Sequence, residues 1–224
     1  MNLGETTWPE LREPRLLAIP VGATEQHGPH LPCTVDTDIA GALCERLAEQ
    51  RPVVIAPAVA YGSSGEHAGF PGTLSIGQTA TEMLLTELGR SADAFAGVVL
   101  VSCHGGNAAP VRNAVRTLRS EGRRALAWSP TGPAGDSHAG RTETSVMLAL
   151  RPHAVHLERA EPGNTAPLPE LIDRLRDGGT AAVSDNGVLG DPRGASGSEG
   201  RRILHAWTES LVDAVDTWAS TTER

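Results

Sequence analysis

Carboxylate and imidazole side chains are concentrated in one short stretch that follows an apolar run near the N-terminus. The stretch offers five such groups: Glu25, His27, His30, Asp36 and Asp38. Imidazole nitrogens and carboxylate oxygens are ligands that Zn²⁺ accepts from proteins. The apolar run, residues 16–22, is typical of a buried strand, and open α/β sheets place their active sites just beyond strand ends. The stretch therefore predicts a site for a divalent metal ion.

Polar donors also follow three further apolar runs, residues 53–56, 98–101 and 125–128, each of which predicts a strand. The donors after these runs are, in order, Glu66 and His67, then His104 and Asn107, then Asp136, His138 and Glu143. The carboxyl ends of parallel strands lie along one edge of a sheet, so these groups can converge there. Polar residues scattered over the surface would not fall regularly after the end of each strand.

The strands alternate with segments of helical periodicity. We expect helices over residues 39–50, 79–95, 110–120, 143–150, 168–176 and 201–219. The alternation predicts a single domain over residues 1–224, a layered α/β/α fold with a mostly parallel sheet. In the second helix, Met83, Leu84 and Leu88 are expected on one face. The long Gly- and Pro-rich region 163–200 predicts a binding loop or an oligomer contact.

Composition excludes several classes of function. The 224 residues carry a net charge of −8 with no basic run, which argues against nucleic-acid binding. No apolar stretch approaches the 18 or so residues of a membrane span, and the N-terminus lacks the pattern of a secretory signal. Three cysteines without a CxxC pair indicate a reducing, cytoplasmic location.

Each candidate also has an alternative structural reading. Glu25 and His27 share one side of an extended segment, but they would also suit a solvated loop. Asn107 would serve equally as a turn or cap residue. Glu143 is favoured in the first turn of a helix by the helix dipole alone. His67 would orient a ligand, bind substrate, or simply hydrogen-bond to the loop backbone.

Four motifs in order resemble those of the creatininase family. They are a G-x-x-E-Q-H-G-P-H-L-P segment at 22–32 with Asp36, an E-H-x-x-F-P-G-T segment at 66–73, an H-G-G-N segment at 104–107 and a D-x-H-A-G-x-x-E-T-S segment at 136–145. The resemblance spans most of the chain. It implies an α/β metal-dependent amidohydrolase that holds two divalent metal ions and assembles into a homo-oligomer, commonly a hexamer.

The resemblance also implies roles for individual residues. Glu25, Asp36 and His104 match the ligands of one metal ion. His27 and Asp36 match ligands of the other, with the Asp36 carboxylate bridging the two.

One expected ligand is missing from its usual place. In creatininase itself a further carboxylate lies two residues after the histidine that matches His104, but this chain has Gly106 there. Glu143 is the candidate that would replace it. His138 matches the family's catalytic histidine, with Asp136 as a candidate to orient it. Further candidates for substrate contact or for support of the ligands are Glu66, His67 and Asn107.

Segments 163–168, 178–184 and 187–192 resemble one branch of the family, the peptidases of mycofactocin biosynthesis. These trim a modified precursor peptide near its C-terminus and release a Val–Tyr-derived core. The chain departs from the family pattern at Ser102-Cys103 and at Arg141, which bears on substrate fit. We therefore expect a metal-dependent hydrolase that acts on a peptide bond.

Two other functions stay open at this stage. One is hydrolysis of a small cyclic or linear amide such as creatinine, and the other is a metal-stabilised binding protein without turnover. The donor types permit Zn²⁺, Mn²⁺, Fe²⁺ or Co²⁺.

Overall fold

A four-stranded parallel sheet forms the centre of the computed structural model, which describes residues 1–221. Its strands are β1 (Leu16–Val21), β2 (Val53–Ile55), β3 (Gly97–Ser102) and β4 (Ala125–Trp128). They lie in the order β2-β1-β3-β4, and every neighbouring pair is parallel. The strands are rich in Val, Leu and Ala because both faces of the sheet are covered.

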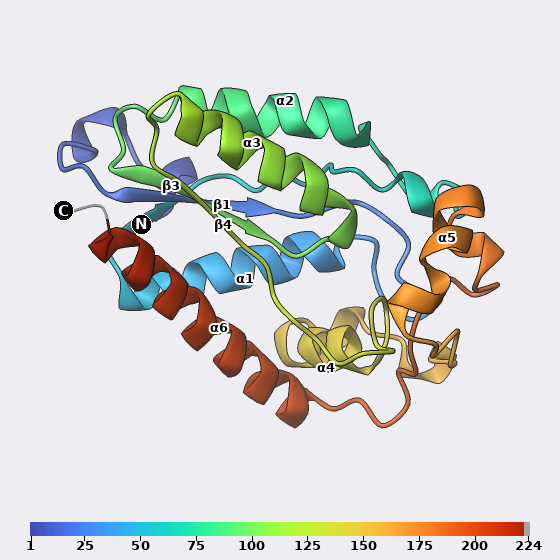
Figure 1. Cartoon of the computed structure of the whole chain (residues 1–224). Coiled ribbons are helices and arrows are strands. Elements are labelled where there is room, and N and C mark those ends of the chain that lie inside the picture. Colours follow the sequence, from blue (N-terminus) through green and yellow to red (C-terminus); the bar gives the residue numbers. More distant parts are fainter. Residues whose placement is uncertain (222–224) are drawn as a thin grey trace.

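Helices cover the two faces as separate layers (Figure 1). On one side lie α2 (Gly77–Arg90) and α3 (Ala108–Ser120), and on the other α1 (Val35–Gln50), α4 (Arg141–Leu150) and α6 (Gly197–Ser220). Successive strand residues point to opposite faces. Leu17 and Ile19 thus pack with α3, whereas Ala18 packs with α1 and α6. The predicted layered α/β fold with a parallel sheet is confirmed.

Three helix predictions need correction, and the last of these helices begins at Gly197 instead of residue 201. The first helix begins at Val35 instead of residue 39, which places Asp36 in its first turn. The second ends at Arg90 instead of residue 95. Met83 of this helix is 63% exposed, and the buried positions are Thr81, Leu85, Thr86 and Gly89. Gly89 explains the choice of face, since a Cβ there would lie 2.4 Å from Leu118 of α3, so only glycine permits this close packing.

Region 163–200 is mostly irregular, as expected, and contains α5 (Leu168–Gly178) and the first residues of α6. It lies beyond the sheet, at the far side from the chain termini (Figure 1). A small apolar cluster of its own, Leu171, Val183 and Leu189, holds it in place. The helix therefore stands apart from the two main cores.

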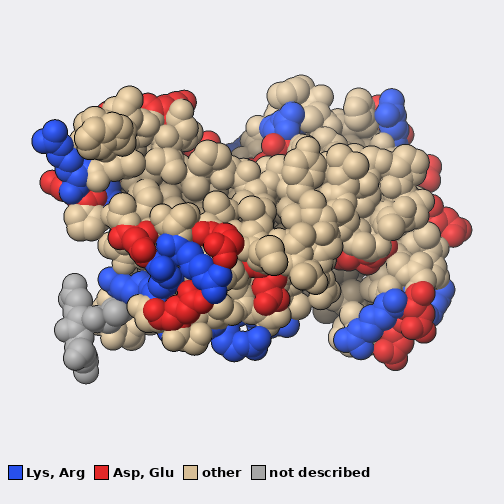
Figure 2. Space-filling view, turned by 90° about the horizontal axis from the view of Figure 1, so that it is seen from above, with Lys and Arg blue, Asp and Glu red and all other residues tan. Residues whose placement is uncertain are grey.

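The surface is mixed in charge. On the face shown in Figure 2, arginines lie beside acidic side chains instead of forming a continuous basic patch. Ion pairs of the described surface include Arg90 with Glu121 and Arg51 with Asp216. Among the helices of residues 1–221, none combines the length and the apolar character needed to cross a bilayer.

Candidate active site

The five side chains predicted to bind metal come together at the carboxyl edge of the sheet. Glu25 and His27 lie in the loop after β1, and Asp36 lies in the first turn of α1. His104 lies two residues after the end of β3, and Glu143 lies in the first turn of α4. All except Glu143 are buried.

One half of the cluster is built around His104. Its Nδ1 lies 3.2 Å from Glu25 Oε1 and 3.6 Å from Asp36 Oδ2. Its Nε2–H donates to the carbonyl of Ser63 at 2.8 Å. This outer hydrogen bond fixes the ring and leaves Nδ1 as the nitrogen that faces the carboxylates, which is the usual arrangement of a metal-ligating histidine.

The other half is built around His27. Its Nε2 lies 3.5 Å from Asp36 Oδ1 and 3.8 Å from Glu143 Oε2. Its Nδ1–H donates to the carbonyl of Glu25 at 3.2 Å, so Nε2 is again the free nitrogen. Asp36 therefore faces both histidines, one with each carboxylate oxygen.

The backbone beside Glu143 is strained. Ala139 has φ of 52°, in the left-handed region that residues with a side chain seldom adopt. Its N–H donates to Glu143 Oε2 at 2.5 Å. The strained turn thus holds the Glu143 carboxylate toward His27, and such outliers concentrate at functional sites.

The cluster leaves polar atoms without partners. Both oxygens of Glu25, Nε2 of His27 and Oδ2 of Asp36 are buried and make no hydrogen bond. Isolated buried polar atoms are costly, so such a set calls for a ligand. Donor atoms of Glu25, His27 and Asp36 all lie within 4.8 Å of one another. The residues present therefore fit divalent metal ions.

The charges of the cluster lead to the same conclusion. Burial alone would lower the pKa of His27, but Asp36 and Glu143 outweigh it and raise that pKa to about 10. For His104, burial is likewise outweighed by Glu25 and Asp36, and the pKa rises to about 10. Burial raises the pKa of Glu143 to about 7. Without metal, protons on the two imidazoles balance the carboxylates, which is the charge that a divalent ion would supply.

Position 106 has no room for a side chain. A Cβ on Gly106 would lie 2.1 Å from the carbonyl oxygen of Ser63 and 2.4 Å from Glu66 Oε1. The carboxylate of Glu143, which reaches the cluster from α4, lies on the side of His27 instead. The structure thus brings Glu143 to the cluster that lacks a carboxylate at Gly106.

His138, Glu66 and His67 surround the cluster. His138 Nδ1 and His67 Nε2 lie 3.7 Å and 3.4 Å from Glu25 Oε1. Glu66 Oε1 lies 3.7 Å from His104 Nε2, and burial raises the pKa of the Glu66 carboxyl.

The two remaining candidates, Asn107 and Asp136, form hydrogen bonds with backbone groups. Asn107 accepts from the N–H of Ser63 and donates to the carbonyl of Gly22, so it supports the residue whose carbonyl holds His104. Asp136 accepts from the N–H groups of Arg141 and Thr142 at the start of α4. It does not contact His138 through any hydrogen bond, which departs from the expectation that it orients that ring.

His30 and Asp38 lie outside the cluster. His30 Nε2 lies 2.9 Å from the hydroxyl of Thr144, and Asp38 accepts from Thr34 and Arg151. They support the local structure.

Sequence reasoning missed Gln26. Its side-chain nitrogen lies 2.8 Å from His67 Nδ1 and 3.0 Å from His138 Nε2, so it contacts two rings of the site at once. The one sequence feature that could have indicated Gln26 is its position between Glu25 and His27, two of the candidate metal ligands.

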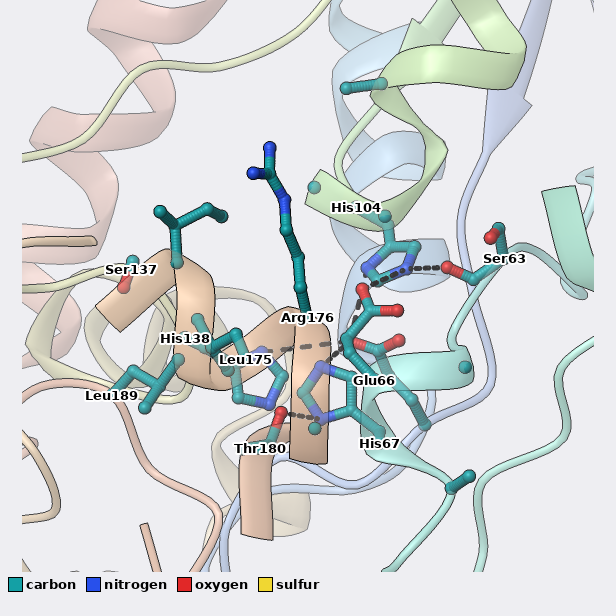
Figure 3. A pocket seen from close by; sticks show the side chains of 18 of the residues that line it. Ser63, Glu66, His67, His104, Ser137, His138, Leu175, Arg176, Thr180 and Leu189 are labelled. Carbon is teal, nitrogen blue, oxygen red and sulfur yellow. Dashed lines mark hydrogen bonds and ion pairs between the residues drawn. The ribbon is translucent and has the colours of Figure 1, made fainter. Parts of the chain in front are cut away.

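A cavity of about 1030 Å³ opens over the cluster. Figure 3 shows the rings of His67, His104 and His138 turned toward this space. Glu66 and residues 104–106, which follow β3, contribute one wall, and Ile172, Leu175 and Arg176 of α5 contribute another. Of the five clustered side chains, Glu25 and His104 line the cavity directly, beside His67 and His138.

Comparison with known proteins identifies the family. The family model for creatininase, described as creatinine amidohydrolase, matches residues 4–215. The chain belongs to the creatininase family. It is therefore a hydrolase of C–N bonds.

Among its relatives, the chain is 50% identical to the "Mycofactocin precursor peptide peptidase" of Mycolicibacterium smegmatis, covering 91% of this chain and 85% of that protein. It is 32% identical to the "Creatinine amidohydrolase" of Pseudomonas putida, covering 95% of each chain. Solved structures of a manganese creatininase and of a zinc–zinc creatininase variant match with TM-scores of 0.81 and 0.80. Both are 28% identical to this creatininase-family chain and cover 96% of it and of themselves.

Proposed function

We propose that residues 1–224 act as one metal-dependent peptidase domain. Its substrate is the modified mycofactocin precursor peptide, in which it hydrolyses an amide bond near the C-terminus and releases the Val–Tyr-derived core. The proposal is supported by the 50% identity to a relative of that name and by the cavity over the donor cluster.

The size of the cavity is the observation that carries the proposal. Ligand pockets for small molecules typically measure about 300–1,000 Å³. At about 1030 Å³, this cavity slightly exceeds that range. A five-membered cyclic amide would occupy a small part of it, whereas a peptide segment of several residues would fill it.

The lining suits the same substrate. Leu168, Ile172 and Leu175 of α5 give one wall an aliphatic surface, and Arg112 and Arg176 add positive charge. An apolar wall buries the apolar side chains of a Val–Tyr-derived group. The arginines offer hydrogen-bond donors to peptide carbonyls or acidic side chains.

The residues at the site have two proposed roles, metal binding and proton transfer. Glu25, Asp36 and His104 would hold one ion, and His27, Asp36 and Glu143 the other. Such ions supply a polarised carbonyl and an activated water when bound. His138 faces the same space and transfers a proton to the leaving amine, the role of a general acid.

We further propose two ions per subunit, of Zn²⁺, Fe²⁺ or Mn²⁺. The two free imidazole nitrogens, each facing a separate pair of carboxylate oxygens, support two positions. The manganese and zinc–zinc creatininase structures support the choice of ions.

The test is a cleavage assay. Metal-loaded protein is incubated with the modified precursor peptide, and the products are identified by mass spectrometry. We expect release of one C-terminal fragment and none from the His138→Ala variant. Full-rate release by that variant would refute the assigned role of His138.

Creatinine or another small amide is the second candidate substrate. The 32% identity to a creatinine amidohydrolase favours it, and the same assay decides between the two. Creatinine turnover without any peptide cleavage would replace the peptidase proposal with this one.

We also propose that the chain works as a homo-oligomer in the cytoplasm. Leu74, Ile76 and Met83, in and just before α2, are exposed by 55%, 40% and 63%, and burial against another copy would remove this apolar surface from water. The three free cysteines suit a reducing compartment. Sedimentation analysis of the metal-loaded protein tests the assembly, and a monomer at micromolar concentration would contradict it.

A further inference from the structure

We propose that Gln26 is a positioning residue that fixes which nitrogen of His67 and of His138 faces the active site. His138 then presents a lone pair to the site, and His67 presents an N–H. The inference rests on the proposed function where it concerns proton transfer. Its structural basis is the hydrogen bonding of one buried glutamine.

Two backbone groups fix the orientation of the Gln26 amide. The N–H of Gly28 donates to Gln26 Oε1 at 2.8 Å, and Gln26 Nε2 donates to the carbonyl of Gly187 at 3.0 Å. A backbone N–H only donates and a carbonyl only accepts, so the amide oxygen and nitrogen cannot be exchanged. Gly187 permits this contact, because a Cβ there would lie 2.2 Å from Gln26 Oε1.

The amide in turn fixes the tautomer of His67. Gln26 Nε2 lies 2.8 Å from His67 Nδ1, and an amide nitrogen can only donate. Nδ1 is therefore an acceptor, and a neutral ring carries its proton on Nε2. That N–H lies on the side of Glu25 Oε1, at 3.4 Å. The hydroxyl of Thr180, 3.3 Å from Nδ1, can also donate to it and so agrees with this tautomer.

Counting donors fixes the tautomer of His138. Its Nε2 lies 3.0 Å from Gln26 Nε2 and 2.9 Å from the backbone carbonyl of Gln26. The amide has only two hydrogens, and His67 and the Gly187 carbonyl take them. If His138 Nε2 accepted one instead, the Gln26 carbonyl would lose its donor, and either the Gly187 carbonyl or His67 Nδ1 would lose its amide hydrogen. His138 Nε2–H therefore donates to the Gln26 carbonyl, and the Nδ1 lone pair faces Glu25 Oε1 at 3.7 Å.

Both rings thus carry their hydrogen on Nε2. His67 faces the site with Nε2, whereas His138 faces it with Nδ1. Their centroids lie 4.4 Å apart, and both side chains are buried. His138 Nδ1 can accept a proton and return it to the leaving amine. His67 Nε2–H can donate to an oxygen that becomes negative during hydrolysis. One glutamine would therefore separate an acceptor role from a donor role.

Side-chain ¹⁵N spectra of histidine-labelled, Zn²⁺-loaded protein test the tautomers directly. In the unmodified protein we expect both His67 and His138 to carry hydrogen on Nε2 and none on Nδ1. The carboxylate introduced by Gln26→Glu accepts where the amide donated, so His67 should gain a proton on Nδ1. Thr180→Val removes only the longer contact and should leave the His67 spectrum unchanged.

Kinetics with the precursor peptide provide the second measurement. Gln26→Glu should lower kcat by roughly 10- to 100-fold and change KM by less than about 3-fold, as expected when an interaction made in the transition state is lost. Gly187→Ala, which displaces the amide without removing it, should lower kcat in the same direction.

A proton on Nδ1 of either ring in the unmodified protein would overturn the inference. So would a Gln26→Glu spectrum in which His67 keeps its original tautomer. The spectra are read without substrate. If neither peptide nor creatinine is cleaved, the proposed function therefore fails while the tautomer assignment is still judged on its own result.

Discussion

Replacement of Glu143 by Gln separates its proposed role as a metal ligand from any structural role. The amide oxygen of Gln can still accept from the N–H of Ala139, which contacts Glu143 Oε2 at 2.5 Å. Because the pKa of Glu143 is raised to about 7, the carboxyl is partly neutral in the metal-free protein at neutral pH. The free energy of unfolding of the metal-free protein should therefore change by less than about 1 kcal/mol.

Metal binding should respond far more strongly. Loss of a residue that only supports a ligand typically lowers metal affinity by about 10- to 100-fold. A carboxylate that contacts the ion should cost at least about 100-fold, or about 2.7 kcal/mol. The structure assigns Glu143 to the side of His27 alone, so one ion per subunit should be lost and the ion near His104 retained.

The assay is elemental analysis of protein loaded with excess Zn²⁺ and then desalted, together with chemical denaturation of the metal-free forms. Glu49→Gln, an exposed position on α1, is the control and should match the unmodified protein in both. If Glu143→Gln retains two ions at unchanged affinity, Glu143 is not the ligand that compensates for Gly106.

Three further predictions concern the cluster and the cavity. The raised pKa values of His27 and His104, both about 10, mean that each holds a proton at pH 7 that metal must displace. Metal loading should therefore release protons, and metal affinity should fall as the pH is lowered. Calorimetry in buffers of different ionisation enthalpy measures this release, and its absence would contradict the prediction. Gly106→Ala should destabilise the protein by about 1–3 kcal/mol and abolish activity, because the added Cβ would collide with the backbone of Ser63. Gly105→Ala is the control and should do neither, because a Cβ at Gly105 would meet no neighbouring atom within 4 Å. Leu175→Ala should raise KM for the precursor peptide with little change in kcat, and an unchanged KM would exclude this wall of α5 from substrate binding.

Much of the fold follows from local patterns in the sequence. The run at 125–128 matches β4, and the run at 16–22 matches β1 to within one residue, because continuous apolar residues of this length favour a buried strand. The buried face of α2 does not follow in the same way. Apolar residues lie on more than one side of that helix, and the close approach of Leu118 to Gly89 selects the face. Such contacts depend on the other helix and cannot be read from α2 alone.

The candidate site divides along similar lines. Glu25, His104 and Glu143 each follow the carboxyl end of a strand in the sequence. This placement predicts that their side chains lie close together, as they do in the structure. Which atom of each residue faces the centre depends on backbone partners, such as the Ser63 carbonyl that binds His104. The part played by Gln26 depends on Gly187, a residue distant in sequence, so residue type and spacing could not predict it.

A metal titration of peptide cleavage tests the central claim most directly. Metal-free protein is supplied with increasing amounts of Zn²⁺ or Mn²⁺, and release of the C-terminal fragment from the modified precursor peptide is followed by mass spectrometry. We predict no release without metal and a rate that saturates at two ions per subunit. Cleavage by the metal-free protein, or no cleavage at any loading with either ion, would contradict the account.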